Sequence, residues 1–421
     1  MNYSDSLKYL NSFLNLERIV FSPDNRLWNL ARMKFLLSWT GHPETDFFPV
    51  LIAGTKGKGS TGFFLESILR AAGIPVGFYS SPHLEDPRER IRVNGRMISR
   101  EKWVAGIRKI RAVLQRKRLP LRYGNFTYFE IMTLLAVLVY KEAKMRVGIF
   151  EVGMGGRLDA TNALRAKVVG ITSIGFDHEA FLGNTLGKIA YEKAAVIHRG
   201  VEAVTVSNQP PAAMVQIRSR VRAQGARLQL AAPSKETCPG LEGEYQRWNA
   251  SVASKMAEIL RSRHGFRIPA VAVQAGVNRK DWPGRFERIR YGSRTYVLDC
   301  AHNPDSVRAL VRHLQKRFPR RRRVLIFGVS RDKRSDVMLQ ILSKYFSDMV
   351  VTPLVSPRTQ EVGTLAAEGR GLFRRIVPAG HAGQALNDAE KMADDFAIIV
   401  VTGSFYLAGE VRKLLKHSLR S

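Results

Sequence analysis

A short run of glycines, hydroxyls and one lysine carries the strongest chemical signal in the sequence. An apolar stretch over 50–53 leads into this run, and a helical pattern follows it directly. Glycines let successive backbone N–H groups point at one anion, and the positive end of the following helix favours that anion. Lys58 can reach terminal phosphates. We therefore predict a cradle for the phosphates of ATP, formed by Gly54, Thr55, Gly57, Lys58, Gly59, Ser60 and Thr61.

The run departs from the strict phosphate-loop pattern of Gly, four residues, Gly, Lys and then Ser or Thr. Gly54 and Gly57 lie closer together, and Gly59 stands where a magnesium-binding hydroxyl would follow the lysine. Ser60 or a more distant group is therefore expected to meet the metal. A plain glycine turn between a strand and a helix would explain the glycines, but not a lysine flanked by hydroxyls. Nucleotide binding is the favoured interpretation.

Polar residues also follow three other apolar runs. Glu151 ends one run, Asp177 and His178 follow a second, and Ser81 follows a third. Ligands of an open α/β sheet bind beyond the carboxyl ends of its strands, so these side chains should converge on the phosphate loop. A carboxylate, an imidazole and a hydroxyl suit Mg²⁺, although imidazole is a less usual ligand for so hard a cation. For each residue alone, a strand-end polar group satisfied by backbone explains the pattern at least as well; together they predict a magnesium site.

The second half of the chain contributes a further polar motif after a strand. Asp299 and His302 lie where that strand leads into a helix, and Arg285 and Lys333 add cations that could close over phosphate. Asp299 and His302 could instead form a structural pair or a helix cap. A cleft between two domains would bring them to the nucleotide. A second glycine-rich loop, over 153–162, is a weak signal by itself.

The elements that position these groups alternate between apolar strand-like runs and helical patterns, which predicts an α/β fold with a mostly parallel sheet flanked by helices. Residues 5–40 predict a helical lead-in, and Asn94-Gly95 predicts a hairpin. Strands are expected over 50–53, 76–79, 147–150, 168–172, 203–206, 296–298, 324–327, 349–352 and 398–401. Helices are expected over 64–72, 101–118, 128–144, 185–197, 211–223, 244–263, 304–318 and 335–346.

The length of 421 residues is too great for one ordinary hydrophobic core, so two domains are expected. A new strand and helix series begins after the turn at 282–285, and residues 231–243 read as a loop. We predict one domain over 1–283 and a smaller one over 284–421.

The composition indicates a soluble cytoplasmic protein, with 45% hydrophobic and 24% charged residues. The longest apolar run, 131–140, is too short to span a bilayer. The first six residues lack a secretory signal, and Asp5 with Glu17 argues against a transit peptide. Cys238 and Cys300 are too few for a disulfide framework, which favours free thiols in a reducing compartment.

The charge is unusual, because 67 Lys and Arg against 36 Asp and Glu give a net charge of +31. Such a charge raises nucleic-acid binding as an alternative. Against it, the cations are dispersed, and the densest run, 320–323, lacks interleaved aromatics. A solvated basic surface that attracts an anionic substrate is the other interpretation. A phosphate-loop protein that binds nucleic acid would show ATP turnover stimulated by nucleic acid and steeply dependent on salt.

Taken in order, the motifs resemble the folylpolyglutamate synthase and dihydrofolate synthase family of the Mur ligase superfamily. The resemblance covers nearly the whole chain. It rests on residues 54–61, 79–84, 89–95, 126–130, 151–162, 177–178, 192–194, 282–285, 299–305 and 402–404. It implies a first domain like a P-loop ATPase and a smaller, Rossmann-like C-terminal α/β domain.

The resemblance also implies roles for individual residues. Lys58 and neighbouring amides would bind ATP phosphates. Arg285, Asp299 and His302 would reach ATP from the second domain, and Lys193 would carry a carbamate. Asn249 would lie near adenine, and the implied magnesium ligands are Ser81, Glu151 and His178. The implied catalytic groups are Lys58, Lys193, Arg285 and His302.

The implied activity is ATP-dependent joining of L-glutamate to the carboxylate of a folate or dihydropteroate through an acyl phosphate. The sequence leaves open whether the acceptor is dihydropteroate, a reduced folate or both. A monomer is expected, with no specific nucleic-acid partner and no membrane. Lys56 stands where the family usually has Asn, Cys300 where a small residue is usual, and the family is not normally this basic. From the residues alone, an ordinary solvated lysine is the favoured interpretation of Lys193, and the carbamate rests on the resemblance.

Overall fold

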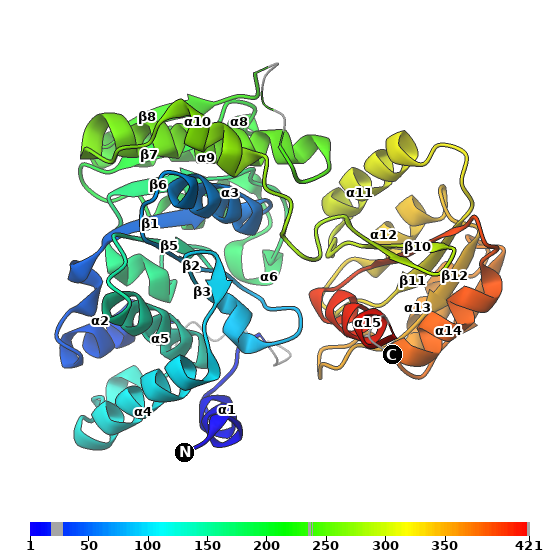
Figure 1. The fold of residues 1–421 in the computed structure, drawn as a ribbon, viewed down its shortest axis with the longest axis horizontal. Coiled ribbons are helices and arrows are strands. Elements are labelled where there is room, and N and C mark those ends of the chain that lie inside the picture. Colours follow the sequence, from blue (N-terminus) through cyan, green and yellow to red (C-terminus); the bar gives the residue numbers. More distant parts are fainter. Residues whose placement is uncertain (18–27, 235–236, 238, 419–421) are drawn as a thin grey trace.

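The computed structural model describes residues 1–17, 28–234, 237 and 239–418, which form two α/β domains side by side (Figure 1). The first domain contains an eight-stranded sheet in the order β4-β3-β2-β5-β1-β6-β7-β8. The pairs from β2 to β8 are parallel, whereas β3 and β4 form an antiparallel hairpin at one edge. The strands are β1 (Phe48–Ala53), β2 (Val76–Tyr79), β3 (Ile91–Val93), β4 (Arg96–Met97), β5 (Val147–Glu151), β6 (Val168–Ile171), β7 (Glu202–Val206) and β8 (Arg227–Ala231).

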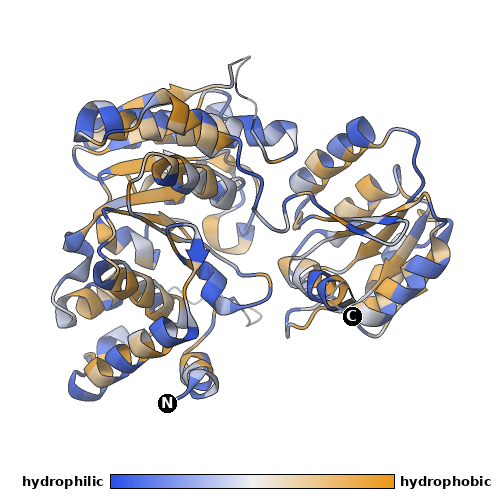
Figure 2. Ribbon diagram, viewed as in Figure 1, coloured by the Kyte–Doolittle hydropathy of each residue, from blue (hydrophilic) through white to orange (hydrophobic). Residues whose placement is uncertain are grey.

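Helices cover both faces of this sheet. They are α1 (Tyr3–Asn11), α2 (Leu30–Trp39), α3 (Lys58–Ala71), α4 (Arg100–Arg116), α5 (Tyr128–Glu142), α6 (Glu179–Leu182), α7 (Leu186–Ala194), α8 (Pro211–Ala223), α9 (Glu244–His264) and α10 (Ala270–Val277). Short 3-10 turns lie over Pro43–Asp46, Pro87–Arg90, Leu121–Tyr123 and Ala160–Leu164. Along β1, Val50 and Ile52 pack with α3 and α9, whereas Leu51 and Ala53 pack toward α7 and α8. A parallel strand buried on both faces is apolar throughout, which explains its signal in the sequence (Figure 2).

The second domain contains a six-stranded sheet in the order β13-β12-β11-β14-β10-β9, in which β9 alone runs antiparallel to its neighbour. The strands are β9 (Glu287–Tyr291), β10 (Arg294–Leu298), β11 (Arg323–Phe327), β12 (Asp348–Val351), β13 (Arg375–Pro378) and β14 (Ile398–Thr402). The helices are α11 (Pro304–Arg317), α12 (Ser335–Leu342), α13 (Val362–Gly369), α14 (Ala382–Met392) and α15 (Phe405–Ser418).

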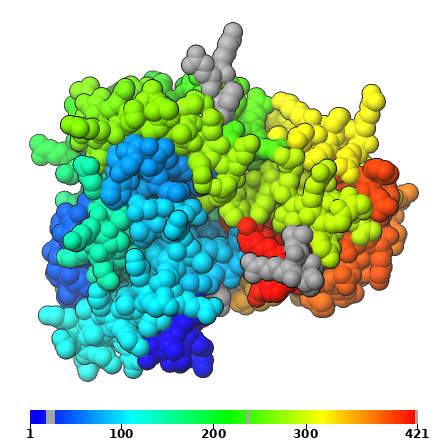
Figure 3. All heavy atoms as spheres, viewed as in Figure 1, coloured from blue at the N-terminus to red at the C-terminus, as the bar shows by residue number. Residues whose placement is uncertain are grey.

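The linker between the domains is anchored to the first domain by an aromatic side chain. The Trp282 ring stacks on Phe63 of α3, with centroids 5.1 Å apart, and lies 5.7 Å from Phe78 of β2. The guanidinium of Arg92 also lies over the Trp282 ring, 5.3 Å from its centroid. In the space-filling view, the two domains lie against one another (Figure 3).

The predicted α/β class with two sheet domains is confirmed. The hairpin at Asn94-Gly95 is present, with both residues at positive φ, as the tight turn requires. The lead-in predicted over 5–40 contains α1 and α2, and residues 18–27 lie outside the described part of the chain. The helix expected over 335–346 ends earlier, at Leu342. Among the described residues, no helix is both long enough and apolar enough to cross a membrane.

Candidate active site

The phosphate loop joins the central strand β1 to α3. Gly57 is the N-terminal cap of α3 and has a φ of 84°, a conformation that favours glycine. A Cβ at Gly57 would lie 2.0 Å from Asn249 Oδ1, and a Cβ at Gly54 would lie 1.9 Å from Thr172 Oγ1. The loop is therefore closely packed between α9 and the end of β6. Its backbone can follow this path only with glycine at both positions.

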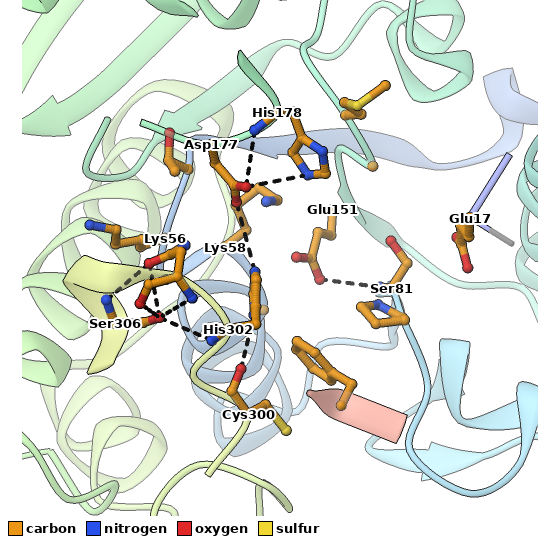
Figure 4. A pocket seen from close by; sticks show the side chains of 18 of the residues that line it. Glu17, Lys56, Lys58, Ser81, Glu151, Asp177, His178, Cys300, His302 and Ser306 are labelled. Atoms are coloured by element: carbon orange, nitrogen blue, oxygen red, sulfur yellow. Dashed lines mark hydrogen bonds and ion pairs between the residues drawn. The ribbon is translucent and has the colours of Figure 1, made fainter. Parts of the chain in front are cut away.

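A cavity of about 640 Å³ lies between the two domains, next to this loop (Figure 4). The first domain contributes most of the predicted site residues to its wall: Thr55, Gly57, Lys58, Gly59, Ser60, Ser81, Glu151, His178 and Asn249. The second domain contributes Arg285, Asp299 and His302. Gly54 and Thr61 lie behind this wall, and the Thr61 hydroxyl donates to the carbonyl oxygen of Asn249 (3.4 Å). Residues predicted from both halves of the chain thus face one space.

The residues predicted to bind magnesium lie at neighbouring strand ends. The Ser81 N–H donates to Glu151 Oε2 (3.3 Å). Burial raises the pKa of Glu151, an effect that Lys58 and Arg285 partly offset. Burial also lowers the pKa of His178 to about 3, and nearby Lys333 acts in the same direction, so this imidazole is neutral at pH 7. A neutral imidazole is the form that can ligate a metal.

In the described part of the chain, no group of three His, Cys, Asp or Glu residues is arranged to hold a metal ion by itself. Mg²⁺ usually keeps several waters and takes only one or two protein carboxylates together with substrate phosphates. Ser81, Glu151 and His178 could supply the protein part of such a site.

Ion pairs made by two acidic residues, Asp177 and Asp305, connect the domains across the cavity. Lys333 Nζ of the second domain lies 2.7 Å from Asp177 Oδ1, and His302 Nε2 lies 3.7 Å from Asp177 Oδ2. Burial alone would raise the pKa of Asp177, but His178, Lys333 and His302 hold it well below its usual range. Lys56 forms the other pair, with Asp305 at the start of α11. Asp177 is therefore a buried carboxylate that joins the two halves of the site.

The polar motif of the second domain has a defined local structure. Asp299 accepts hydrogen bonds from the N–H groups of Phe286 (2.9 Å) and Ala301 (3.0 Å), and burial raises its pKa. The His302 Nδ1–H donates to the carbonyl oxygen of Cys300 (2.9 Å), which leaves Nε2 facing Asp177. The cap of α11 is Asn303, so the alternative in which Asp299 or His302 caps this helix is wrong.

Arg285 reaches the cavity from the linker side. Its guanidinium lies 4.7 Å from the centroid of the Phe405 ring, a cation–π contact that orients it. The free thiol of Cys300 is buried, and burial raises its pKa to about 12. Cys238 lies outside the described residues.

Lys193 lies behind the phosphate loop and not in solvent. Its side chain on α7 is only 4% exposed, and Nζ donates to the carbonyl oxygen of Gly54 (2.9 Å). Burial lowers the pKa of Lys193 to about 7, and the positive charge of Lys58 acts in the same direction. A substantial fraction of this amine is therefore neutral at physiological pH.

Two structural features that support the site were not predicted from the sequence: a buried aspartate and a buried ion pair. Asp159 is buried and accepts hydrogen bonds from the N–H groups of Gly153 (3.0 Å) and Met154 (3.1 Å), which fixes the second glycine-rich loop. Glu130 pairs with Arg32 (2.8 Å) in the wall of the cavity. The Thr127-x-x-Glu130 spacing is a helix capping box and could have located this pair at the start of α5.

Comparisons with known proteins agree with this architecture. The family model of the Mur ligase glutamate ligase domain matches residues 284–405. The chain is 33% identical to the dihydrofolate synthase/folylpolyglutamate synthase of Bacillus subtilis, over 92% of this chain and 95% of the relative.

Two solved structures are also similar. That of Mycobacterium tuberculosis folylpolyglutamate synthase complexed with ADP has a TM-score of 0.88 at 30% identity, with 98% of each chain covered. That of E. coli FolC in complex with DHPP and ADP has a TM-score of 0.85 at 29% identity, covering 100% of this chain and 99% of that chain. The sequence identity over almost the full length shows that this chain belongs to the folylpolyglutamate synthase/dihydrofolate synthase family.

Proposed function

We propose that this protein is an ATP-dependent ligase that joins L-glutamate to the carboxylate of a folate or dihydropteroate. The observation that carries the proposal is the single cavity in which the phosphate loop of the first domain faces Arg285, Asp299 and His302 of the second. The ADP and DHPP bound to similar proteins support it. The acceptor could be dihydropteroate, a reduced folate or both.

The proposed reaction needs no nucleophile from the enzyme. The substrate carboxylate attacks the γ-phosphorus of ATP, ADP leaves, and an acyl phosphate forms. The amine of glutamate then attacks the acyl carbon, phosphate leaves with the C–O bonding pair, and the amine loses a proton as the amide forms. The protein positions the reactants and neutralises developing negative charge, for which Lys58 and Arg285 are placed in the cavity wall.

We assign Mg²⁺ to Ser81, Glu151 and His178, beside the phosphate loop. The ion would neutralise charge on the phosphates when bound. Lys58, Gly57, Gly59 and neighbouring amides would hold those phosphates, and Asn249, beside Gly57, would lie toward the base.

Lys193 is proposed to carry a carbamate. Its neutral Nζ would attack the carbon of CO₂, one C=O bonding pair would move to oxygen, and the nitrogen would release a proton to solvent. The buried position and the pKa of about 7 favour the neutral amine that this reaction requires. The product would replace a cation beside Gly54 and Lys58 with an anion near the proposed magnesium site.

We also propose that residues 1–283 form the ATP-binding domain and residues 284–421 the glutamate ligase domain. The family match that begins at residue 284 and the start of β9 at Glu287 support this boundary. A monomeric protein in the cytoplasm remains our prediction.

The test is ADP release with L-glutamate and either dihydropteroate or tetrahydrofolate, followed by mass analysis of the pterin product. We expect release to require both substrates and the product to gain one glutamate residue. ADP release that ignores both substrates but rises with nucleic acid would contradict the ligase and support the alternative of a nucleic-acid-binding ATPase.

The magnesium assignment predicts the behaviour of two variants. Glu151→Gln and His178→Ala should both raise the Mg²⁺ concentration required for half-maximal activity, because each removes one metal-binding group. Titrating Mg²⁺ at saturating ATP measures this effect. Asp336→Asn, which changes an exposed carboxylate at the start of α12, is the control and should titrate like the wild type. Unchanged titrations in both site variants would refute the assignment.

Domain closure leads to another expectation. Arg285, Asp299 and His302 can reach ATP only when the second domain lies against the first. ATP with a pterin substrate should therefore shift the protein in solution toward its compact form. Small-angle X-ray scattering would show a smaller radius of gyration with both ligands than without them. Identical scattering curves in the two conditions would count against a cleft that closes.

A further inference from the structure

A second cavity, of about 890 Å³, lies at the junction of the two domains and is here called the linker cavity. Its wall contains the loop 240–242 of the first domain, the linker 280–283, and parts of β9, α11 and α15 of the second. Arg285 lines both this cavity and the candidate active site. The linker cavity plays no part in the reaction proposed above.

The wall of the linker cavity is strongly basic. Seven of its residues are Lys or Arg and three are Asp or Glu, which leaves an excess of four positive charges. The excess positive charge of the whole chain is dispersed, but here several cations line one cavity that is open to solvent on one side. Like charges near one another repel, and they repel more strongly where water is partly excluded. An anion bound there would relieve that repulsion.

The carboxylates of the wall already have partners. Glu242 lies 2.7 Å from Arg288 Nη2 and 3.5 Å from Arg317 Nε, and His313 also approaches it (3.2 Å). Because Glu242 belongs to the first domain and its partners to the second, this carboxylate joins the domains. One carboxylate shared by two arginines cannot neutralise both.

Glu287 and Asp281 also have partners already. Glu287 accepts from Arg412 Nε (2.8 Å) and from the Gly284 N–H (2.8 Å), and Asp281 pairs with Arg279. No acidic side chain of the wall is thus left for the remaining cations.

Two exposed cations of the wall have no acidic partner. Lys280 and Arg290 form neither an ion pair nor a side-chain hydrogen bond with any other residue that the structure describes, whereas Arg285 acts on the buried carboxylates Glu151 and Asp299. Arg288 and Arg290 are two residues apart on the edge strand β9, so their side chains leave the same face of the sheet. Guanidinium groups bind phosphate and carboxylate through paired N–H donors.

We propose that the linker cavity binds a small polyanion that carries at least two phosphate or carboxylate groups. Lys280 and Arg290 supply free cations at its exposed side, and Arg285, whose charge also acts on Glu151 and Asp299, lies at the side shared with the active site. The ligand would contact the linker and the second domain together.

Occupation of the linker cavity should weaken ATP binding, because the anion competes for the charge of Arg285. By linkage, ATP would weaken binding of the anion by the same factor. The linker cavity is therefore a site through which a small anion can lower the affinity for ATP.

The experiment is isothermal titration of the enzyme, saturated with ADP and without added divalent cations, with pyrophosphate and separately with tricarballylate. ADP fills the nucleotide site, so only binding elsewhere is detected. We expect at least one of the two anions to bind with a stoichiometry of one. The anion that binds more tightly shows whether phosphate or carboxylate groups are preferred.

The double variant Lys280→Glu/Arg290→Glu should bind the anion about tenfold more weakly, since two partly exposed charge contacts are reversed. Lys117→Glu/Arg118→Glu is the matched control, because it makes the same change of charge at exposed residues outside both cavities. The control should bind like the wild type. Lys280→Gln/Arg290→Gln removes the cations without adding acids and should also bind more weakly.

The proposal fails if neither anion shows saturable binding at saturating ADP, or if both charge-reversal variants weaken binding equally. It also fails if the glutamine variant, with a wild-type unfolding temperature, binds like the wild type. These titrations do not depend on ligase activity, so they remain informative if the proposed reaction is wrong.

Discussion

Replacing Lys58 by alanine should lower glutamate-dependent ADP release by a factor of about 10² to 10³ or more, the usual effect of removing a group that stabilises charge in the transition state. Lys58 begins α3 and lies in the wall of the interdomain cavity, where its ammonium can meet the phosphoryl group in transfer. Most of the loss should appear in kcat, because the charge on that group changes during the reaction.

The fold of this variant should be unaffected. Lys58 is the first residue of α3 and lies in the cavity wall, outside the hydrophobic core, so the free energy of unfolding should change by less than about 0.5 kcal/mol. Circular dichroism and denaturant unfolding check this beside the kinetic assay. A folded Lys58→Ala protein with near-normal turnover would show that the loop does not act on phosphate as proposed.

Lys193→Ala should lose most of its activity although the side chain does not line the cavity. The substitution removes both the proposed carbamate and the hydrogen bond to Gly54 that supports the phosphate loop. Acetate should restore part of the activity, because it can occupy the space of the lost carboxylate. Lys188→Ala, at an exposed lysine of the same helix, is the control and should retain wild-type activity.

The carbamate itself can be observed directly. With ¹³C-bicarbonate, the wild-type protein should give a carbamate carbon signal that Lys193→Ala lacks. Because the folded pKa of Lys193 is about 7, the signal should grow as the pH rises through that value and fall in more acidic buffer. A wild-type protein that is fully active without any such signal would exclude carbamylation and leave Lys193 a purely structural role.

The same pKa has a consequence for stability that separates the two roles. An unfolded lysine titrates near 10.5 and the buried one near 7, so between these values the unfolded chain binds more protons. The unmodified lysine therefore destabilises the fold most below about pH 7, and this cost declines as the pH rises toward 10.5. Lys193→Met should consequently be no less stable than the unmodified wild type in acidic buffer.

The central strands could be predicted from the sequence because burial on both faces makes them continuously apolar. The strand predicted over 76–79 has the same bounds as β2, and the strand predicted over 147–150 ends one residue before β5 does. The edge strands β8, β9 and β13 were missed, since their residues alternate between partly buried and exposed and include several arginines. Charged residues at sheet edges prevent pairing with other chains, and they also weaken the strand signal.

The convergence of Glu151 and His178 on one cavity was predictable, because each lies at or after the end of an apolar strand of the same parallel sheet. The ion pairs that join the two domains across the cavity could not be predicted from the sequence. Lys333 and Asp177 are 156 positions apart, and Lys56 and Asp305 are 249 apart. No local pattern identifies such partners, because only the packing of one domain against the other brings them together. Burial of Lys193 arises within the first domain, where α7 packs against the sheet and brings Nζ to the carbonyl oxygen of Gly54, and the helical pattern by itself does not show this.

The strand order of the first sheet also determines when the protein can bind nucleotide during its own synthesis. β1 lies between β5 and β6, and the phosphate loop rests against Thr172 and Asn249. On the ribosome, the loop leaves the exit tunnel long before these supports are made. Sheets with such distant pairings form late, and their unpaired strands are exposed while the chain grows. ATP therefore cannot stabilise the nascent chain until α9 has emerged, and before then the apolar strand β1 is an unpaired segment that is prone to aggregation.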